Sequence, residues 1–293
     1  MSVKALYDVA APAKLNLFLH VVGRRADGYH LLQSLFVLID WCDTLHFELR
    51  TDGRLARHDL GATLPDDDLC LRAARALQKQ SSTSLGADIS IMKQLPSGAG
   101  MGGGSSDAAS TLIALNRLWG ARQTRAELLT LALSLGADVP FFVGGSNAFV
   151  EGIGERISPI SVGLERFAVI KPSAGLQTPA IFAAPDLVRN SEAVIVEGLV
   201  EEVAENGGHL PNGYGRNDLQ PVAAAKCEEI GQVSSWLQAR FGNGRMTGSG
   251  SAVFARLGQV TDLDASLTEL PNGWTGRMCM GLEAHPLCEW LED

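Results

Sequence analysis

Alternating apolar and polar positions predict β-strands in the first part of the chain. Over residues 14–22 every second residue is aliphatic, which is the period of a strand with one buried face. Lys14 and Asn16 therefore share the face opposite the aliphatic one. The Asp27-Gly28 pair that follows has the chemistry of a hairpin turn. Further strands are expected over residues 31–39, 44–49 and 89–92, with a strand pair over 147–157.

Helical periodicity appears after residue 66. Three aspartates precede a helix expected over residues 69–79, and acidic residues favour the positive end of a helix dipole. A second apolar stripe predicts a helix that ends near Trp119. Thr124 and Glu127 form a capping box for a third helix, which Gly136 closes. Beyond it we expect strands over residues 167–171, 245–256 (interrupted at 248–250) and 274–280, and helices over 191–205, 221–241 and 262–269.

These elements predict an α+β protein in two parts. The chain has 293 residues, which is long for one hydrophobic core. Because the apolar pattern loosens near residues 159–166, we predict an N-terminal domain over residues 1–160 and a C-terminal domain over residues 161–293. Strands and helices alternate in the second domain, which indicates a layer of helices on an antiparallel or mixed sheet.

Composition and charge exclude several classes of function. The net charge of −9 argues against a surface that binds nucleic acid. The five cysteines are scattered without a CxxC pair, which suits a reducing cytosol. The six histidines lack the spacing of a metal site, so the sequence assigns no metal ligand. Neither a signal peptide nor a membrane-spanning run is evident, and we expect a cytoplasmic protein without a membrane partner.

The strongest chemical signal is a glycine-rich loop. Five glycines lie between Gly98 and Gly104, and two serines and a helix follow them. Glycine lets the backbone approach a ligand closely, and the amides that open a helix attract phosphate. The spacing of Gly98, Gly100 and Gly103 fits G-x-G-x-x-G, but a second helix follows where a dinucleotide site needs a strand. Since no lysine follows the last glycine, a Walker A loop is also excluded, and we interpret the segment as another kind of phosphate-binding loop.

Four other features have two interpretations each when taken alone. Asp138, at an expected helix–strand junction and close to a proline, is either a turn former or a catalytic group. Lys14 is either a solvated strand residue or part of a site. Tyr29 and His30 either pack against a turn or stack on a base. Residues 246–251 form a second glycine–serine loop, either a tight hairpin or a second approach of the backbone to phosphate.

Taken together, these motifs resemble those of the GHMP kinase superfamily. Residues 96–106 are similar to the family's central ATP loop, residues 13–16 to its first motif and residues 247–250 to its third. Further similarity lies at residues 25–30, 136–142, 152–155 and 178–182. The resemblance implies a two-domain GHMP kinase fold, with an N-terminal domain like domain 2 of ribosomal protein S5, a ferredoxin-like C-terminal domain and an active site in the cleft between them.

The resemblance also implies a reaction. It implies that ATP, with Mg²⁺, phosphorylates the 2-hydroxyl of a cytidine diphosphate-linked methylerythritol, in the non-mevalonate isoprenoid pathway of a bacterial cytoplasm. Lys14 and Asp138 match the family's catalytic pair. Asp138 would orient the hydroxyl and accept its proton, while Lys14 would keep Asp138 ionised and stabilise charge on the transferred group. The implied ATP site consists of Pro96, Ser97, Gly98, Ala99, Gly100, Met101, Gly102, Gly103, Gly104, Ser105 and Ser106.

The implied acceptor site joins residues far apart in the sequence. Tyr29 and Phe182 match a stacking sandwich around cytosine, and His30 would contact the edge of the base. Asn16 would lie near the diphosphate and erythritol part of the substrate. Further members of the implied substrate site are Ile153 and Thr178.

Two positions depart from the family pattern, and two other functions stay open. Asp68 stands where members often have an asparagine near the nucleotide ribose, and Met101 replaces a usual leucine. One alternative is a homoserine- or mevalonate-type acceptor, against which the stacking pocket argues. The other is a nucleotide-binding module without chemistry, against which the presence of both Lys14 and Asp138 argues. We expect small-molecule substrates as the only partners, and a monomer or weak homodimer.

Overall fold

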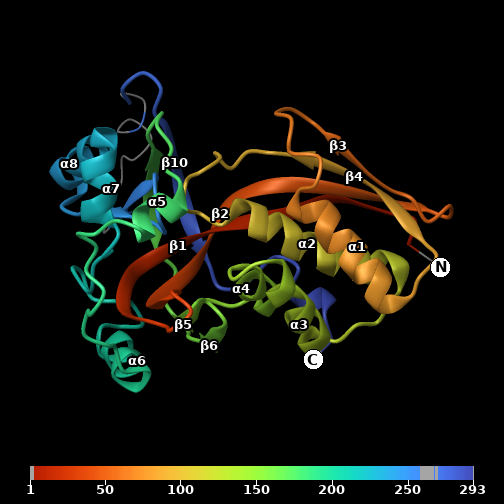
Figure 1. Cartoon of the computed structure of the whole chain (residues 1–293), viewed down its shortest axis with the longest axis horizontal. Coiled ribbons are helices and arrows are strands. Elements are labelled where there is room, and N and C mark those ends of the chain that lie inside the picture. Colours follow the sequence, from red (N-terminus) through yellow and green to blue (C-terminus); the bar gives the residue numbers. More distant parts are fainter. Residues whose placement is uncertain (1–2, 258–266, 268–269, 293) are drawn as a thin grey trace.

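A long antiparallel hairpin at the start of the chain organises the fold (Figure 1). The computed structural model describes residues 3–257, 267 and 270–292. Strands β1 (Ala5–Arg24) and β2 (His30–Arg50) pair along almost their whole length. Gly28 in the connecting turn has a φ of 92°, the left-handed conformation for which the Asp-Gly pair is suited. The predicted hairpin is therefore confirmed.

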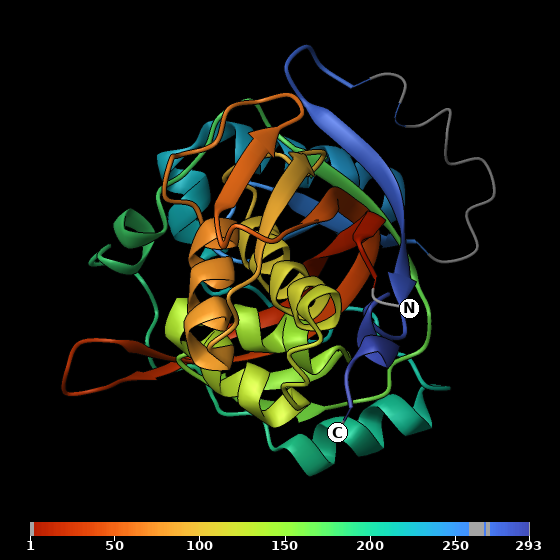
Figure 2. The same ribbon diagram turned by 90° about the vertical axis from the view of Figure 1, so that its right-hand side faces the viewer.

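The N-terminal half builds a layer of helices against this hairpin. Strands β4 (Gly86–Met92) and β5 (Ala148–Gly152) pair with β2, β3 (Leu55–Asp59) pairs in parallel with β4, and β6 (Arg156–Pro159) pairs with β5. The helices are α1 (Leu69–Ser81), α2 (Gly103–Trp119), α3 (Arg125–Leu135) and α4 (Val139–Gly144). These helices lie together on one side of the sheet, with α1 beside α2 (Figures 1 and 2).

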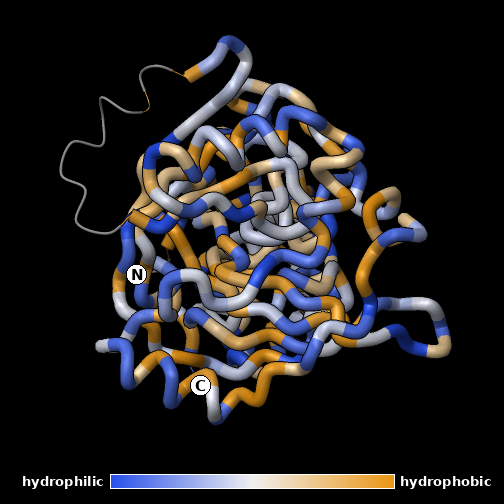
Figure 3. The backbone as a smooth tube through the Cα atoms, turned by 90° about the vertical axis from the view of Figure 1, so that its left-hand side faces the viewer, coloured by the Kyte–Doolittle hydropathy of each residue, from blue (hydrophilic) through white to orange (hydrophobic). Residues whose placement is uncertain are grey.

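Helix α2 lies at the centre of the main hydrophobic core. Leu112 and Leu115 of this helix are fully buried, in one cluster with Leu38 and Phe47 of β2. Burying a leucine side chain stabilises a fold by about 1.5–3 kcal/mol. Figure 3 shows how hydrophobic and hydrophilic stretches alternate along the backbone. The core therefore holds the start of α2, where the glycine loop ends, on a rigid support.

The C-terminal half extends the same sheet. Strands β7 (Arg166–Lys171), β8 (Arg245–Met246), β9 (Val253–Leu257) and β10 (Thr275–Leu282) are antiparallel neighbours in the order β10-β7-β9-β8. This is the strand order of a ferredoxin-like sheet, as expected. Gly281 of β10 lies opposite Ile39 of β2, which joins the two halves. Further helices are α5 (Thr178–Phe182), α6 (Val196–Glu205), α7 (Gln220–Lys226), α8 (Glu228–Phe241) and the 3-10 helix η1 (Cys288–Trp290).

The predicted α+β class is confirmed, whereas several predicted elements have the wrong extent. Residues 31–39 and 44–49 form one strand, β2, because Asp43 between them is buried and accepts the N–H groups of Gln94 and Leu95 at 2.5 and 2.8 Å. The helix expected over residues 221–241 is divided at Cys227, whose φ of −141° and ψ of 99° are extended. The domain boundary near residue 160 stays a prediction.

Other differences concern short elements. The helix expected over residues 191–205 begins only at Val196. Asp138 lies between helices α3 and α4 rather than at the expected helix–strand junction. The sequence pattern does not predict α4, α5 or β3. These elements have five or six residues, too few for a hydrophobic period to be evident. The helix expected over residues 262–269 lies outside the described residues except at residue 267.

Candidate active site

The glycine-rich loop packs tightly against the second glycine–serine loop. Gly98, Gly100 and Gly102 have φ values of 64°, 74° and 73°, which favour glycine. A Cβ atom on Gly100 would lie only 2.3 Å from the carbonyl oxygen of Thr247. The N–H of Ser251 donates to the carbonyl of Gly98 at 3.0 Å, so backbone bonds also join the two loops. The two glycine motifs, about 150 residues apart, therefore form one structural unit.

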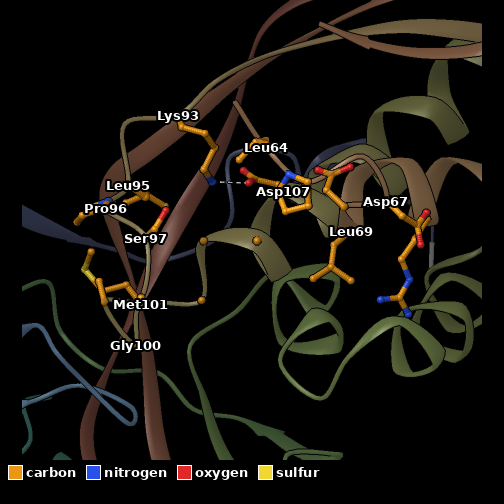
Figure 4. Close-up of a pocket in the computed structure, with 18 residues that line it drawn as sticks. Leu64, Asp67, Leu69, Lys93, Leu95, Pro96, Ser97, Gly100, Met101 and Asp107 are labelled. Carbon is orange, nitrogen blue, oxygen red and sulfur yellow. Dashed lines mark hydrogen bonds and ion pairs between the residues drawn. The ribbon is translucent and has the colours of Figure 1, made fainter. Parts of the chain in front are cut away.

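The start of α2 is arranged to bind an anion. Gly102 caps the helix without a side-chain hydrogen bond, which leaves the first amides available to a ligand. A cavity of about 410 Å³ lies beside it (Figure 4). Residues 96–104 of the predicted ATP site all line this cavity, whereas Ser105 and Ser106 lie in the first turn of α2 outside the lining. Ser106 is fully buried, and its hydroxyl has no hydrogen-bond partner in the described part of the chain.

A buried charge cluster borders the same cavity. Lys93 donates to the carboxylates of both Asp43 and Asp107, and it points toward Asp107 in Figure 4. Burial raises the pKa of Asp107 to about 8, although the charge of Lys93 opposes this shift. Asp68, which also lines the cavity, caps α1 by accepting the N–H of Leu71 at 3.1 Å, and it pairs with Arg57 at 2.9 Å. Its carboxylate is thus already engaged within the protein.

A second cavity, of about 310 Å³, contains the predicted catalytic pair. Lys14 and Asp138 both line it. Lys14 is buried, and its ammonium group lies 4.6 Å from the centre of the Phe36 ring. Burial lowers the pKa of Lys14, and the nearby Asp138 carboxylate partly offsets this effect. Asp138 occupies the N-cap position of α4 without making a cap hydrogen bond, so its carboxylate can serve a ligand in the cavity.

Asn16 lines this cavity and holds its polar groups in place. Its Oδ1 accepts from Lys14 Nζ at 2.5 Å and from the Thr247 hydroxyl at 3.1 Å. Its Nδ2 donates to the Ser34 hydroxyl at 2.8 Å. The predicted shared face of Lys14 and Asn16 is confirmed, and Asn16 links the first and third motifs.

A third cavity, of about 550 Å³, collects the residues predicted to bind the acceptor. His30 stacks on Phe182 with ring centroids 5.1 Å apart. Tyr29 lines the same cavity with 62% of its surface exposed. Burial lowers the pKa of His30, and the charges of Arg189 and Arg24 act in the same direction. Ile153 and Thr178 complete this part of the predicted site.

The three cavities adjoin one another through shared lining residues, and we call this row of cavities the groove. Gly100 and Gly102 line both the first and the second cavity. The second and third cavities have in common Leu32, Ile153, Thr178 and Phe182. A phosphate-binding loop, a Lys–Asp pair and an aromatic pocket thus follow one another along the groove.

Comparison with known proteins identifies the family. The protein-family model described as GHMP kinases N terminal domain matches residues 68–146. The family model described as GHMP kinases C terminal matches residues 195–262. The 4-diphosphocytidyl-2-C-methyl-D-erythritol kinase of Methylibium petroleiphilum is 59% identical over 293 residues, which cover 99% of each chain. The chain belongs to the 4-diphosphocytidyl-2-C-methyl-D-erythritol kinase family of GHMP kinases. The protein of that name from a Polaromonas species is 60% identical, covering 98% of this chain and 94% of its own.

Solved structures support the same fold for this kinase. A crystal structure of 4-(cytidine 5'-diphospho)-2C-methyl-D-erythritol kinase is 33% identical, with a TM-score of 0.77, and the match covers 93% of this chain and 98% of that chain. Homoserine kinase from Cytophaga hutchinsonii is 16% identical with a TM-score of 0.71, which is a likeness of fold alone. Among the described residues, no helix is long and apolar enough to cross a bilayer.

Several residues that shape the groove of this kinase carry no sequence signal of their role. Lys93 stands three residues before the glycine loop, where its charge alone gave no sign of burial. Arg189 donates to His30 Nε2 at 3.0 Å across 159 residues of sequence. Asn217 donates to the carbonyl oxygens of Met246 and Gly248 at 2.7 and 2.9 Å, and so supports the third motif. Each of these contacts depends on the tertiary fold, and no local pattern indicates it.

Proposed function

We propose that this kinase transfers the γ-phosphoryl group of ATP to the 2-hydroxyl of 4-diphosphocytidyl-2-C-methyl-D-erythritol, in the non-mevalonate isoprenoid pathway. One observation carries the proposal: the phosphate-binding loop, the Lys14–Asp138 cavity and the aromatic pocket are consecutive parts of one groove. An elongated acceptor with a base at one end and a hydroxyl at the other suits that order. A donor phosphate at the loop would then face the hydroxyl in the middle cavity.

In this proposal the glycine-rich loop holds the ATP phosphates. The uncapped amides at the start of α2 and the positive end of the helix dipole favour bound phosphate. Gly100 and Gly102 line both of the first two cavities, and a Cβ on Gly100 would lie only 2.3 Å from the carbonyl oxygen of Thr247. The loop therefore requires glycine at these positions for its conformation and, at Gly100, for its close approach to the second glycine–serine loop.

Lys14 and Asp138 would act on the transferred group and on the acceptor. Phosphoryl transfer depends mainly on positioning and on neutralising charge. Asp138 orients the 2-hydroxyl and accepts its proton. The buried ammonium group of Lys14 stabilises negative charge that develops on the phosphoryl oxygens, and Asn16 fixes its position. Because Lys14 is buried, its effect on that charge is stronger than it would be in water.

The aromatic pocket would bind the cytosine. Phe182 and Tyr29 offer ring surfaces, and His30 offers a ring nitrogen at the edge of the cavity. Ile153 and Thr178 line both this cavity and the catalytic one, where the diphosphate and the erythritol would pass. A small aliphatic acceptor such as homoserine or mevalonate has no ring that could stack on these aromatic side chains.

Magnesium fits this site when it arrives with the nucleotide. Within the described residues, no group of three or more His, Cys, Asp or Glu side chains could hold a metal ion by itself. The buried, unpartnered Ser106 hydroxyl at the first turn of α2 is an oxygen of the type that Mg²⁺ accepts beside phosphates. We propose Ser106 as the residue that would hold the ion, which supplies positive charge to the phosphates.

We also propose that the protein is a cytoplasmic monomer or weak homodimer.

An acceptor panel tests the proposal. Purified protein is assayed for ADP release with ATP, magnesium and, separately, 4-diphosphocytidyl-2-C-methyl-D-erythritol, homoserine and mevalonate. We expect turnover with the cytidyl substrate, and kcat/KM at least a hundredfold lower with either small alcohol. Preferred turnover of homoserine or mevalonate would contradict the proposed acceptor, and ATP binding without turnover of any acceptor would contradict the proposed enzyme.

A further inference from the structure

One hydrogen bond in the aromatic pocket has a chemical consequence for His30. The Nε–H of Arg189 donates to His30 Nε2 at 3.0 Å. An arginine side chain has only donors and stays protonated in proteins, so it cannot accept a hydrogen bond from the imidazole. Nε2 of His30 must therefore carry a lone pair. The ring is then neutral, and its one proton is on Nδ1.

The surroundings of His30 support the neutral form. Arg189 and Arg24 both place positive charge near the ring, and His30 is partly buried. Both charges and the burial oppose a second proton on the imidazole. Within the described part of the chain, Nδ1 has no hydrogen-bond partner, and His30 lines the aromatic cavity. The Nδ1–H group is thus a donor available to a ligand.

The same guanidinium group also holds the other wall of the pocket. Arg189 donates to the carbonyl oxygens of Phe182 and Ala184 at 3.3 and 2.5 Å, at the end of α5. Phe182 is the residue on which His30 stacks. Arg189 therefore joins the start of β2, where His30 lies, to the end of α5, where Phe182 lies.

We propose that Arg189 is a positioning residue that fixes His30 in the Nδ1–H tautomer, so that His30 is a permanent hydrogen-bond donor to the base of the acceptor substrate. The edge of the base that faces His30 must then carry a hydrogen-bond acceptor. This acceptor is either a carbonyl oxygen or an unprotonated ring nitrogen. Cytosine offers both kinds, at O2 and N3. The role in substrate binding rests on the proposed function, whereas the tautomer itself does not.

Nitrogen NMR tests the tautomer without any substrate. The ¹⁵N shifts and long-range ¹H–¹⁵N couplings of the imidazoles are recorded at pH 7 for the wild type and for Arg189→Gln, with His30→Phe to assign the His30 signals. We expect a protonated Nδ1 and a bare Nε2 in the wild type, and a mixture of tautomers in Arg189→Gln. A wild-type ring protonated on Nε2, or on both nitrogens, would overturn the proposal.

A double-mutant cycle tests how Arg189 acts on the substrate. We expect Arg189→Gln and His30→Phe each to raise the KM for the cytidyl acceptor about tenfold, the value of one lost hydrogen bond, while kcat falls less than about threefold. The double variant should be no worse than the poorer single variant, because Arg189 acts through His30. Effects that multiply would show that Arg189 only supports α5, and would refute the positioning role. If no variant and no wild type turns over the cytidyl acceptor, the proposed function fails while the NMR result still decides the tautomer.

Discussion

Lys14 Nζ donates to Asn16 Oδ1 at 2.5 Å, and both side chains are almost completely buried. The two residues are one strand period apart, so β1 presents them side by side on one face. Asn16 also accepts from Thr247, which connects the ammonium group to the third glycine motif. The position of the buried charge therefore depends on an amide that is itself held by two hydroxyl groups.

Replacing Asn16 with alanine should impair both stability and catalysis. The change removes the side-chain acceptor of the buried Lys14 ammonium and one hydrogen bond each from Ser34 and Thr247, so we expect the free energy of unfolding to fall by about 2–3 kcal/mol and kcat at least tenfold. Urea unfolding and initial rates measure the two effects. Asn206→Ala is the matched control, because Asn206 is exposed and makes one bond to a backbone carbonyl. An Asn16→Ala protein that behaves like this control would exclude the organising role of Asn16.

Two glycines of the loop should respond differently to alanine. A Cβ on Gly100 would lie 2.3 Å from the carbonyl oxygen of Thr247, whereas a Cβ on Gly98 would have no atom within 4 Å. Both have positive φ, so each alanine costs about 1–2 kcal/mol in conformation alone. We expect Gly100→Ala to raise the KM for ATP more than tenfold and Gly98→Ala to change it less than threefold. Equal effects of the two substitutions would contradict the packing of the two loops.

A buried histidine should make the stability depend on pH. His285 accepts the N–H of Leu287 at 3.1 Å, and burial lowers the pKa of His285 from 6.5 to about 4. The unfolded chain therefore binds a proton between pH 6.5 and about 4 that the folded chain does not, so stability falls as the pH falls through this range. We expect a loss of about 2 kcal/mol between pH 7 and pH 5 from this group.

Urea unfolding at the two pH values measures this dependence. His285→Asn removes the titrating group. The stability lost between pH 7 and pH 5 should therefore be about 2 kcal/mol smaller in this variant than in the wild type. Comparing slopes, not stabilities, separates this effect from the loss of packing in the variant. An unchanged slope would mean that His285 does not titrate in this way.

The sequence predicts the long, periodic elements well and the chemical grouping less directly. The capping box at Thr124 and the helix that follows Gly102 are local features, and the structure confirms both. Taken alone, the residues left Lys14 and Asp138 with two interpretations each. Their resemblance to family motifs paired them, and the structure brings them to one cavity although 123 residues lie between them in the sequence. Their catalytic role remains a prediction.

What the sequence could not predict depends on contacts across the fold. Asp43 is buried within β2, where backbone amides of residues 94 and 95 satisfy its carboxylate, so the two strands expected over residues 31–39 and 44–49 are one continuous strand. Arg189 has no motif of its own, and its role is evident only when the start of β2 reaches α5. Short elements such as α4, which positions Asp138, have too few residues to show a period.

The central claim is that Asp138 serves the acceptor hydroxyl and not the binding of ATP. The most direct test compares Asp138→Asn with the wild type in two measurements: the Kd for ATP by calorimetry, and kcat with ATP, magnesium and the cytidyl acceptor. Asp52→Asn, in the exposed turn after β2, controls for the loss of one carboxylate. We expect Asp138→Asn to bind ATP within about twofold of the wild type and to lose at least a hundredfold in kcat. A kcat within about threefold of the wild type would contradict the account.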